Sequence, residues 1–133
     1  MSIVAAHLRI TAWDEKPVSE FEDGSKITRA DVTLADGDHG VESGRFASVM
    51  FYRPDGTSHY AIVMRLVATL DDRTGTFALS GEGYFDGTTA SYAATVVPDS
   101  ATGQLVGITG ACTSDSTHAE YPFMPLVVTY ELP

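Results

Sequence analysis

Four side chains of this sequence are candidate catalytic groups: Tyr60, Tyr92, Tyr130 and Arg45. A tyrosine hydroxyl can donate a hydrogen bond to a carbonyl that gains negative charge in a transition state, while its ring packs on an apolar substrate. The guanidinium group of Arg45 can hold a carboxylate, enolate or tetronate-like anion, because its donors form a rigid fork. Structural roles are the alternative: a core tyrosine can bond to backbone, and Arg45 can pair with nearby Glu42.

Other reactive residue types occur without the spacing that their usual sites require. Cys112 is the single cysteine, which excludes an intrachain disulfide and a multi-thiolate zinc site. Histidines and acids meet in residues 36–39 and 118–120, but neither segment has the spacing of a metal site, so we expect no metal and no cofactor. His118 and Glu120 could act as an acid–base pair if their loop faced a barrel mouth, and a solvated loop is the alternative.

The elements that position these groups are read from turns and β-branched runs. Asp36-Gly37, Asp55-Gly56 and Asp86-Gly87 are strong hairpin signals. The segments between turns are rich in Val, Ile, Thr, Tyr and Phe, which favour strands. We expect strands at residues 3–13, 27–35, 44–53, 57–70, 75–85, 88–97, 104–114 and 125–132. Residues 14–26 are expected to form a solvated loop or a short edge strand, and residues 115–124 a loop.

A helix is the alternative for His59–Leu70, which contains Ala, Met and Leu. Its flanking turns and its β-branched residues favour a strand. Successive long strands joined by tight turns leave exposed edges unless the sheet closes on itself. Since 133 residues suit one domain, we predict a single all-β domain over residues 1–133, an antiparallel up-and-down barrel of about eight strands with a calycin-like, apolar lumen.

Hairpin registers predict which residues face the lumen. If Asp55-Gly56 is a two-residue turn, Phe51 faces Tyr60 and Arg45 faces Leu66. The same reasoning at Asp86-Gly87 places Tyr92 inside, and Trp13 is expected at one end of the barrel. The expected substrate-binding residues are Leu8, Ile10, Trp13, Val49, Phe51, Ile62, Met64, Leu66, Phe77, Leu79, Phe85, Ile108, Cys112 and Val128. Ala12, Ala47, Val106, Leu126 and Leu132 are also expected inside.

The expected inner face contains several small residues, among them Gly81, Gly83, Ala90 and Ala94. An eight-stranded barrel holds just enough space for side chains, or for one small ligand where the side chains are small. Glycine within a strand can instead mark a bulge or a bend. We expect an apolar cavity for a small hydrophobic molecule, and a filled core is the alternative.

Composition restricts the partners. Eighteen acidic and eight basic residues give a net charge of -10, which argues against nucleic acid and anionic membranes. Without a long apolar run or a signal-peptide pattern, we expect no membrane span and a cytoplasmic protein. An expected outer face with Phe46, Met50, Tyr52, Val63 and Val67 is apolar enough to predict a homodimer contact.

Several segments together resemble one bacterial family. They are Thr11–Glu15, Phe51–Thr57, Thr74–Leu79, Gly83–Ala90, Val96–Gly110 and Tyr130–Leu132. The most specific of them contains Val-Pro-x-Ser-x-Thr-Gly-x-Leu-x-Gly, at Val97–Gly107. The family is the domain of unknown function numbered three-two-two-four, which has an allene-oxide-cyclase-like barrel. These motifs are mostly turns and packing positions, so they specify a fold better than a chemistry.

The resemblance implies a class of chemistry. The wider barrel superfamily includes cyclases and isomerases of reactive fatty-acid and polyketide intermediates, and it is similar to plant dirigent proteins. Our hypothesis is a cofactor-independent cyclase or isomerase of natural-product biosynthesis, which closes a ring in, or isomerises, a polyene- or polyketide-like intermediate. A non-catalytic, lipocalin-like carrier of a hydrophobic ligand is the alternative. Met64 stands where the family commonly has a carboxylate, which removes an acid or base from the expected lumen.

Overall fold

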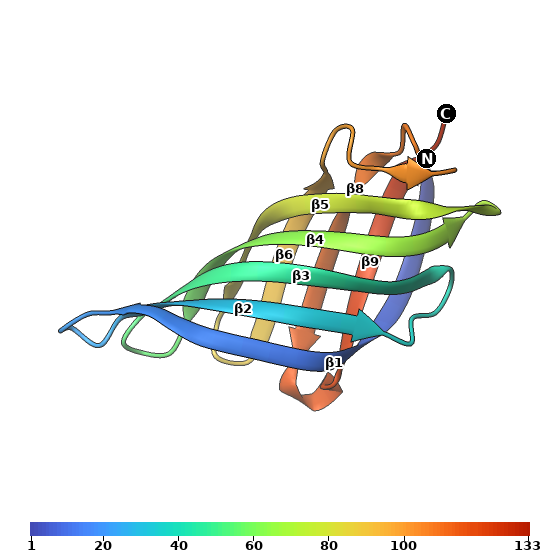
Figure 1. Ribbon diagram of the computed structural model, residues 1–133. Coiled ribbons are helices and arrows are strands. Elements are labelled where there is room, and N and C mark those ends of the chain that lie inside the picture. The colour runs from blue at the N-terminus through green and yellow to red at the C-terminus, as the bar shows by residue number, and fades with distance from the viewer.

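The computed structural model describes residues 1–133 and consists almost entirely of antiparallel strands (Figure 1). The strands are β1 (Ser2–Glu20), β2 (Lys26–Ala35), β3 (Val41–Tyr52), β4 (Ser58–Leu70), β5 (Arg73–Phe85), β6 (Thr89–Val96), β7 (Thr102–Gly103), β8 (Thr109–Thr117) and β9 (Phe123–Glu131). A single 3-10 turn, η1 (His118–Glu120), joins β8 to β9. No helix in the structure has the length and hydropathy to cross a membrane.

The sheet closes into a ring of eight strands. The hydrogen-bonded order is β4-β3-β2-β1-β9-β8-β6-β5, and a β4–β5 pairing completes the circle. The two-residue strand β7 adds to the free side of β5. The ring is barrel-like but uneven, since the β1–β2 hairpin projects far beyond the other strands (Figure 1). The predicted all-β barrel is confirmed, and His59–Leu70 lies within strand β4.

The first strand is longer than predicted. Residues 14–20, expected to be a loop or a short edge strand, pair with β2 as far as Glu20↔Lys26. The register shifts once between Pro17 and Ser19, and a bulge of this kind accommodates a proline that cannot donate to the ladder. The exposed acidic side chains of this segment therefore lie on a strand.

The predicted register of β3 is wrong by one residue. Arg53 donates its N–H to Thr57 O at 2.8 Å, and Gly56, with φ of +89°, donates to Arg53 O at 2.9 Å. The loop therefore has three residues, 54–56, instead of two. Because a one-residue shift turns every side chain to the other face, Arg45, Ala47, Val49 and Phe51 point outward. The inner side chains of β3 are Phe46, Ser48, Met50 and Tyr52.

The β5–β6 hairpin differs from the prediction by an even shift. Asp86 and Thr89 flank a two-residue turn at Gly87-Thr88, so Gly83 pairs with Tyr92 instead of Ala90. A shift of two residues preserves the face. The predicted inner residues of these strands, including Phe77, Leu79 and Tyr92, are accordingly buried.

Two further positions are corrected. A bulge between Ile10 and Ala12 changes the facing of β1, so that Ala12 is exposed and Trp13 turns to the lumen side. The predicted strand 104–114 begins only at Thr109, since residues 104–108 form a turn. Within this turn Leu105 is buried and Val106 is 61% exposed, contrary to the prediction that Val106 faces inward.

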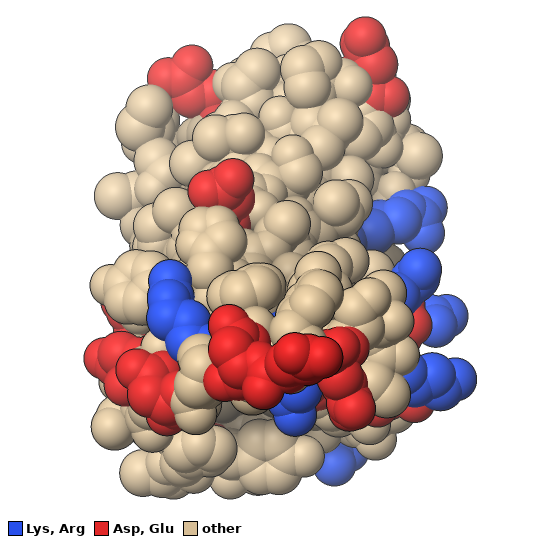
Figure 2. Space-filling model, turned by 90° about the vertical axis from the view of Figure 1, so that its left-hand side faces the viewer, with Lys and Arg blue, Asp and Glu red and all other residues tan.

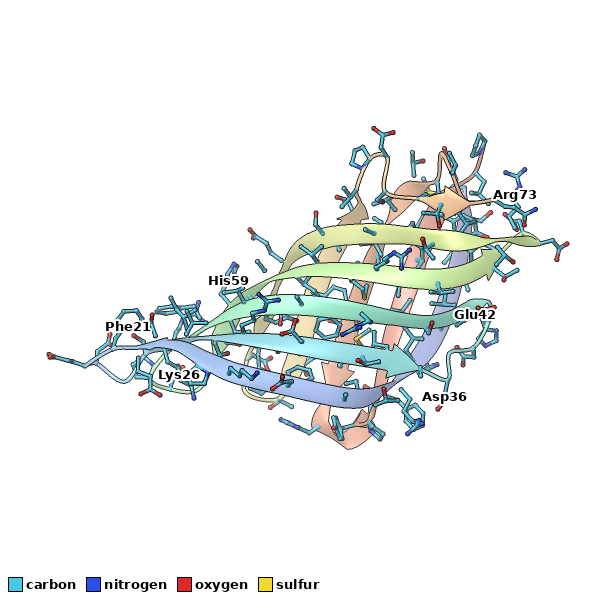
Figure 3. All side chains as sticks on the ribbon, viewed as in Figure 1. Phe21, Lys26, Asp36, Glu42, His59 and Arg73 are labelled. Carbon is cyan, nitrogen blue, oxygen red and sulfur yellow. The ribbon has the colours of Figure 1, made fainter.

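The most completely buried side chains lie toward one end of the barrel, the end at which Figure 1 shows both chain termini. The largest side chains there are fully buried: Leu8, Leu34, Met64, Leu66, Phe77, Leu79, Leu105, Leu126, Val32, Val41, Val128 and Cys112. In Figure 3, Asp36, Glu42 and Arg73 mark this closed end, whereas Phe21, Lys26 and His59 lie toward the other.

Candidate functional site

An apolar cavity of about 580 Å³ occupies the other half of the barrel. It lies where the β3–β4 and β5–β6 hairpins and the β8–β9 connection come together. Its 18 lining residues, of which 12 are hydrophobic, are Ile10, Trp13, Phe46, Ser48, Met50, Tyr52, Ser58, Tyr60, Ile62, Phe85, Thr88, Ala90, Tyr92, Ser116, Thr117, His118, Tyr121 and Met124. Its volume falls within the range of sites for drug-sized molecules, which is roughly 300–1,000 Å³.

Six residues predicted for the site line this cavity: Tyr60, Tyr92, Ile10, Trp13, Ile62 and Phe85. They come from β1, β4, β5 and β6, and they meet only because the sheet closes. The structure thus brings together two of the four candidate catalytic groups.

Most of the other predicted substrate-binding residues face inward but belong to the packed core. These are Leu8, Met64, Leu66, Phe77, Leu79, Ile108, Cys112 and Val128, all at most 5% exposed. Burial raises the pKa of the Cys112 thiol to about 12, so it stays protonated at neutral pH. These residues support the floor of the cavity from below and do not line it.

Four predicted residues lie elsewhere. Arg45, Val49 and Phe51 are exposed on the outer face of β3, because of the three-residue loop described above. Tyr130 is buried at the closed end, where burial, and after it the Asp71 carboxylate, raise its pKa. It borders a small polar pocket with Arg73 and Glu131, away from the apolar cavity. The prediction that Arg45 holds an anion in the lumen is therefore wrong, because its side chain lies on the outer face of the barrel.

The prediction missed two groups of lining residues. Phe46, Ser48, Met50 and Tyr52 were assigned to the outer face, but they line the cavity. The sequence signal for the three-residue loop that turns them inward is Pro54-Asp55-Gly56, in which Gly56 adopts a left-handed conformation. The second group, Ser116, Thr117 and Met124, comes from the flanks of the β8–β9 connection. His118 and Tyr121 of this connection had been considered for a barrel mouth, and both line the cavity. Nothing in the local sequence specifies this group beyond its place before the last strand.

The β8–β9 connection lies at the mouth of the cavity. His118 and Tyr121 both line the mouth and remain exposed, and the His118 ring packs edge-on against Phe85 at 5.9 Å between centroids. Glu120 does not line the cavity and accepts a hydrogen bond from the Thr117 hydroxyl at 3.2 Å. His118 thus contacts an apolar ring at the mouth instead of forming the His–Glu pair considered from the sequence.

Tyr60 and Tyr92 supply two of the hydroxyl groups that line the cavity. Tyr92 donates weakly to the sulfur atoms of Met64 and Met124, both at 3.9 Å, and burial raises its pKa well above the usual value. Burial, with the Asp115 carboxylate as the second cause, raises the pKa of Tyr60 to about 12. The Tyr60 hydroxyl makes no hydrogen bond within the protein, and its side chain lines the cavity. It is therefore a free donor at neutral pH.

A glycine opposite Tyr60 gives its ring room. Gly83 pairs with Tyr60 across β4 and β5, and a Cβ atom added there would lie 2.5 Å from Tyr60 Cζ. The ring packs directly over the glycine, so the hydroxyl reaches across the lumen. The sequence suggested a cavity over this glycine, but the Tyr60 ring fills the space above it.

Glu15 holds two aromatic rings of the cavity in place. Its Oε1 atom accepts the indole N–H of Trp13 at 3.0 Å, and its Oε2 atom accepts hydroxyls of Thr28 at 2.9 Å and Tyr52 at 3.1 Å. Burial and the Glu15 charge raise the pKa of Tyr52 to about 12. Trp13 in turn packs edge-on against Phe46 at 6.2 Å. Glu15 was missed because residues 14–26 were expected to be irregular.

The cavity offers hydrogen-bond donors and aromatic surface. Both inner tyrosines stay protonated at neutral pH, so they can polarise a carbonyl but cannot act as bases. No group of three or more His, Cys, Asp or Glu side chains is placed to hold a metal ion.

Fold and site together define a small antiparallel β-barrel that is packed in one half and hollow in the other. The chain belongs to the family described as "Protein of unknown function (DUF3224)", whose model matches residues 4–125. This confirms the resemblance seen in the sequence.

A solved structure of the same family has the same fold. It is a protein of unknown function from the DUF3224 family of Shewanella oneidensis MR-1, with a TM-score of 0.74 and 16% sequence identity over 99% of both chains. At this identity the likeness concerns the fold alone. A comparison with curated proteins found no match.

Proposed function

We propose that the protein binds a small apolar molecule in the barrel cavity and, without a cofactor, templates an intramolecular ring closure or isomerisation of it. One observation carries this proposal: an aromatic-lined cavity of about 580 Å³ into which the unpartnered hydroxyl of Tyr60 opens. A polyene- or polyketide-like intermediate with one carbonyl matches this combination of apolar walls and an unpartnered tyrosine hydroxyl.

The shape of the cavity would supply most of the rate enhancement. Holding a flexible chain in a near-attack conformation can remove several kcal/mol from a barrier, on the order of 7–11 kcal/mol in the best intramolecular cases. Donation from Tyr60 to the carbonyl would add about 2.7–4 kcal/mol, the measured scale for one such donor. Cycloaddition, conjugate addition and double-bond isomerisation all suit a site of this kind.

A lipocalin-like carrier is the second candidate. It is favoured by the lining, which contains no Asp, Glu, Lys or Arg and has His118 at the mouth as its one imidazole. A carrier needs only the apolar volume, whereas most proton-transfer reactions need a positioned base.

The assembly state and location remain predictions. The predicted homodimer contact loses three of its residues, because Phe46, Met50 and Tyr52 face the cavity. Exposed apolar side chains on the outer face of β3 and β4 are instead Val49, Phe51 and Val63. Analytical ultracentrifugation of the wild-type protein and of Phe51→Ser would test a dimer through this face. A cytoplasmic location, and the exclusion of nucleic acid as a partner, rest on the sequence alone.

Native mass spectrometry of the purified protein tests the proposed binding. We expect a co-purifying, extractable small molecule at a ratio of one per chain. Ala90→Phe fills the cavity and should abolish this adduct, whereas Ala93→Phe, on the exposed face of the same strand, should retain it. An adduct that survives Ala90→Phe would contradict the proposed site.

A second measurement separates the enzyme from the carrier. The extracted molecule, or its biosynthetic precursor, is incubated with the wild-type protein and with Tyr60→Phe. Conversion that falls at least tenfold in Tyr60→Phe supports catalysis, and tight binding without conversion supports the carrier.

A further inference from the structure

We infer that the cavity selects a lipophilic organic cation, such as a quaternary ammonium or protonated tertiary amine, over uncharged and anionic molecules of the same shape. This inference rests on the proposed binding function and adds to it that the preferred ligand carries one cationic group on its apolar body.

Six aromatic side chains around the cavity are the first observation. The cavity is lined by the rings of Trp13, Phe46, Tyr52, Tyr60, Phe85 and Tyr92, which come from five different strands and surround one space. The face of an aromatic ring carries the negative end of its quadrupole and attracts cations, and cages of such rings recognise quaternary ammonium groups. The Tyr52 ring already has the ammonium group of Lys26 at 5.2 Å from its centroid. Lys26 itself is exposed and does not line the cavity.

The carboxylate of Glu15 is the second observation. It accepts hydrogen bonds from two of these rings, through Trp13 Nε1 and the Tyr52 hydroxyl. All three of its hydrogen-bond partners are uncharged donors, so its negative charge is not neutralised by a base. A ring that donates to an anion gains electron density on its face, which strengthens its attraction for a cation. Burying a charge is costly unless it is paired, and this carboxylate supplies a compensating negative charge behind two of the lining rings.

The surrounding charge has the same sign. Asp115 acts on the Tyr60 hydroxyl, and the connections around the mouth carry Asp55, Asp86 and Glu120 against Arg53. Figure 2, which views the molecule from the side of the β1–β2 hairpin, shows acidic side chains in a band across the lower half of that face, with Lys and Arg side chains beside them. The whole chain has a net charge of -10. An anion entering the cavity would find no Lys or Arg among the lining residues.

The test is a set of naphthalene probes of different charge, of which the cation and the uncharged probe have the same shape. The cation is (2-naphthylmethyl)trimethylammonium, its uncharged isostere is 2-neopentylnaphthalene, and the anion is 2-naphthylacetate. Their affinities are measured by displacement of the fluorescent apolar probe N-phenyl-1-naphthylamine from the wild-type protein. We expect the cation to bind about tenfold more tightly than its isostere, in line with desolvated cation–π sites, and the anion to bind most weakly.

Two variants assign the effect to Glu15. Glu15→Gln keeps an acceptor for the rings but removes the charge, so cation affinity should fall about fivefold while affinity for the uncharged isostere stays the same. Asp14→Asn is the control, because Asp14 is exposed on the same strand and pairs with Lys16 at 3.4 Å. A merely structural role for Glu15 would weaken all three probes equally and would overturn the assignment.

The outcomes distinguish this inference from the function on which it rests. If N-phenyl-1-naphthylamine binds and the uncharged isostere displaces it as well as the cation does, the cavity binds apolar molecules and the inference is wrong. If N-phenyl-1-naphthylamine does not bind at all, the proposed function fails with it.

Discussion

The two halves of the barrel interior are built from the same strands, yet one half is solid and the other is hollow. Strand β4 shows the change within a few residues: Met64 and Leu66 are at most 1% exposed in the core, while Tyr60 and Ile62 line the cavity. Opposite the core residues lie large partners such as Phe77 and Leu79. Around the cavity several inner positions carry Ser48, Ser58 or Ala90.

This difference teaches that the packing of side chains across the ring, more than hydrophobicity, decides where the lumen opens. Alternation of inward and outward residues continues through both halves, so the pattern of apolar residues is the same. An eight-stranded barrel has space for side chains or for one small guest, and the small residues at one end shift the balance toward a guest. The larger residues at the other end hold the ring together.

The largest expected effect comes from adding the same side chain to each half. Ala68 is fully buried at the closed end, so Ala68→Phe should destabilise the fold by about 3 kcal/mol or more through overpacking. Ala90→Phe enters the cavity and should change the free energy of unfolding by less than about 1 kcal/mol. Urea unfolding of both variants measures the contrast, and equal losses would show that the cavity does not accept the ring.

Removing side chains should give the next largest effect. Leu66→Ala leaves a void in the packed half and should cost about 2–5 kcal/mol. Met50→Ala only enlarges an existing cavity, so we expect less than half of that loss. The comparison uses urea midpoints at constant slope. A Met50→Ala variant as unstable as Leu66→Ala would mean that the hollow half is packed in solution.

The Tyr60 hydroxyl should matter for ligands and not for stability. Tyr60→Phe should leave stability within about 0.5 kcal/mol of wild type, because the hydroxyl has no partner in the protein. Affinity for 2-acetylnaphthalene should fall roughly threefold to tenfold, the scale of one hydrogen bond. Affinity for 2-isopropenylnaphthalene, which lacks the carbonyl, should not change. Tyr84→Phe, at an exposed tyrosine, is the control, and a fall in both affinities would contradict a hydrogen bond to the carbonyl.

The smallest expected effect is a loss of stability in alkaline solution. Burial raises the pKa of Tyr60 to about 12, whereas an unfolded tyrosine titrates near about 10. Above pH 10 the unfolded chain therefore binds fewer protons than the folded one, and this stabilisation is lost as pH rises from 10 through 12. Cys112 extends the loss down to about pH 9 for the same reason. Unfolding free energies at pH 9, 10 and 11 should fall less steeply in Tyr60→Phe, and an unchanged slope would contradict the shift.

The sequence predicted the fold well because turns and β-branched runs are local signals. The alternation of apolar residues correctly predicted which side chains of β4, β6 and β9 point inward. At the β5–β6 turn the register differs from the prediction by two residues, which leaves every side chain on its predicted face. At the β3–β4 turn the shift was odd, so Arg45, Val49 and Phe51 exchanged places with Phe46, Ser48 and Met50. One additional residue in the β3–β4 loop thus changed which side chains of β3 line the cavity.

The site was predictable only in part, because its location depends on packing across the ring. Whether Met64 packs in the core or lines the cavity is decided by partners on other strands, which hairpin registers do not specify. Glu15 was missed for a related reason. Its three hydrogen bonds reach Trp13, Thr28 and Tyr52, and the bonds to Thr28 and Tyr52 depend on pairing between β1, β2 and β3.

Trp13 gives a direct measurement of the central claim, that the hollow half is a binding cavity. It is the single tryptophan of the chain and it lines the cavity, so a bound N-phenyl-1-naphthylamine molecule should quench its fluorescence by energy transfer. We expect saturable one-site quenching in the wild-type protein and in Ala93→Phe, and its loss in Ala90→Phe. Quenching that does not saturate in the wild-type protein, or that is the same in both variants, would contradict the account.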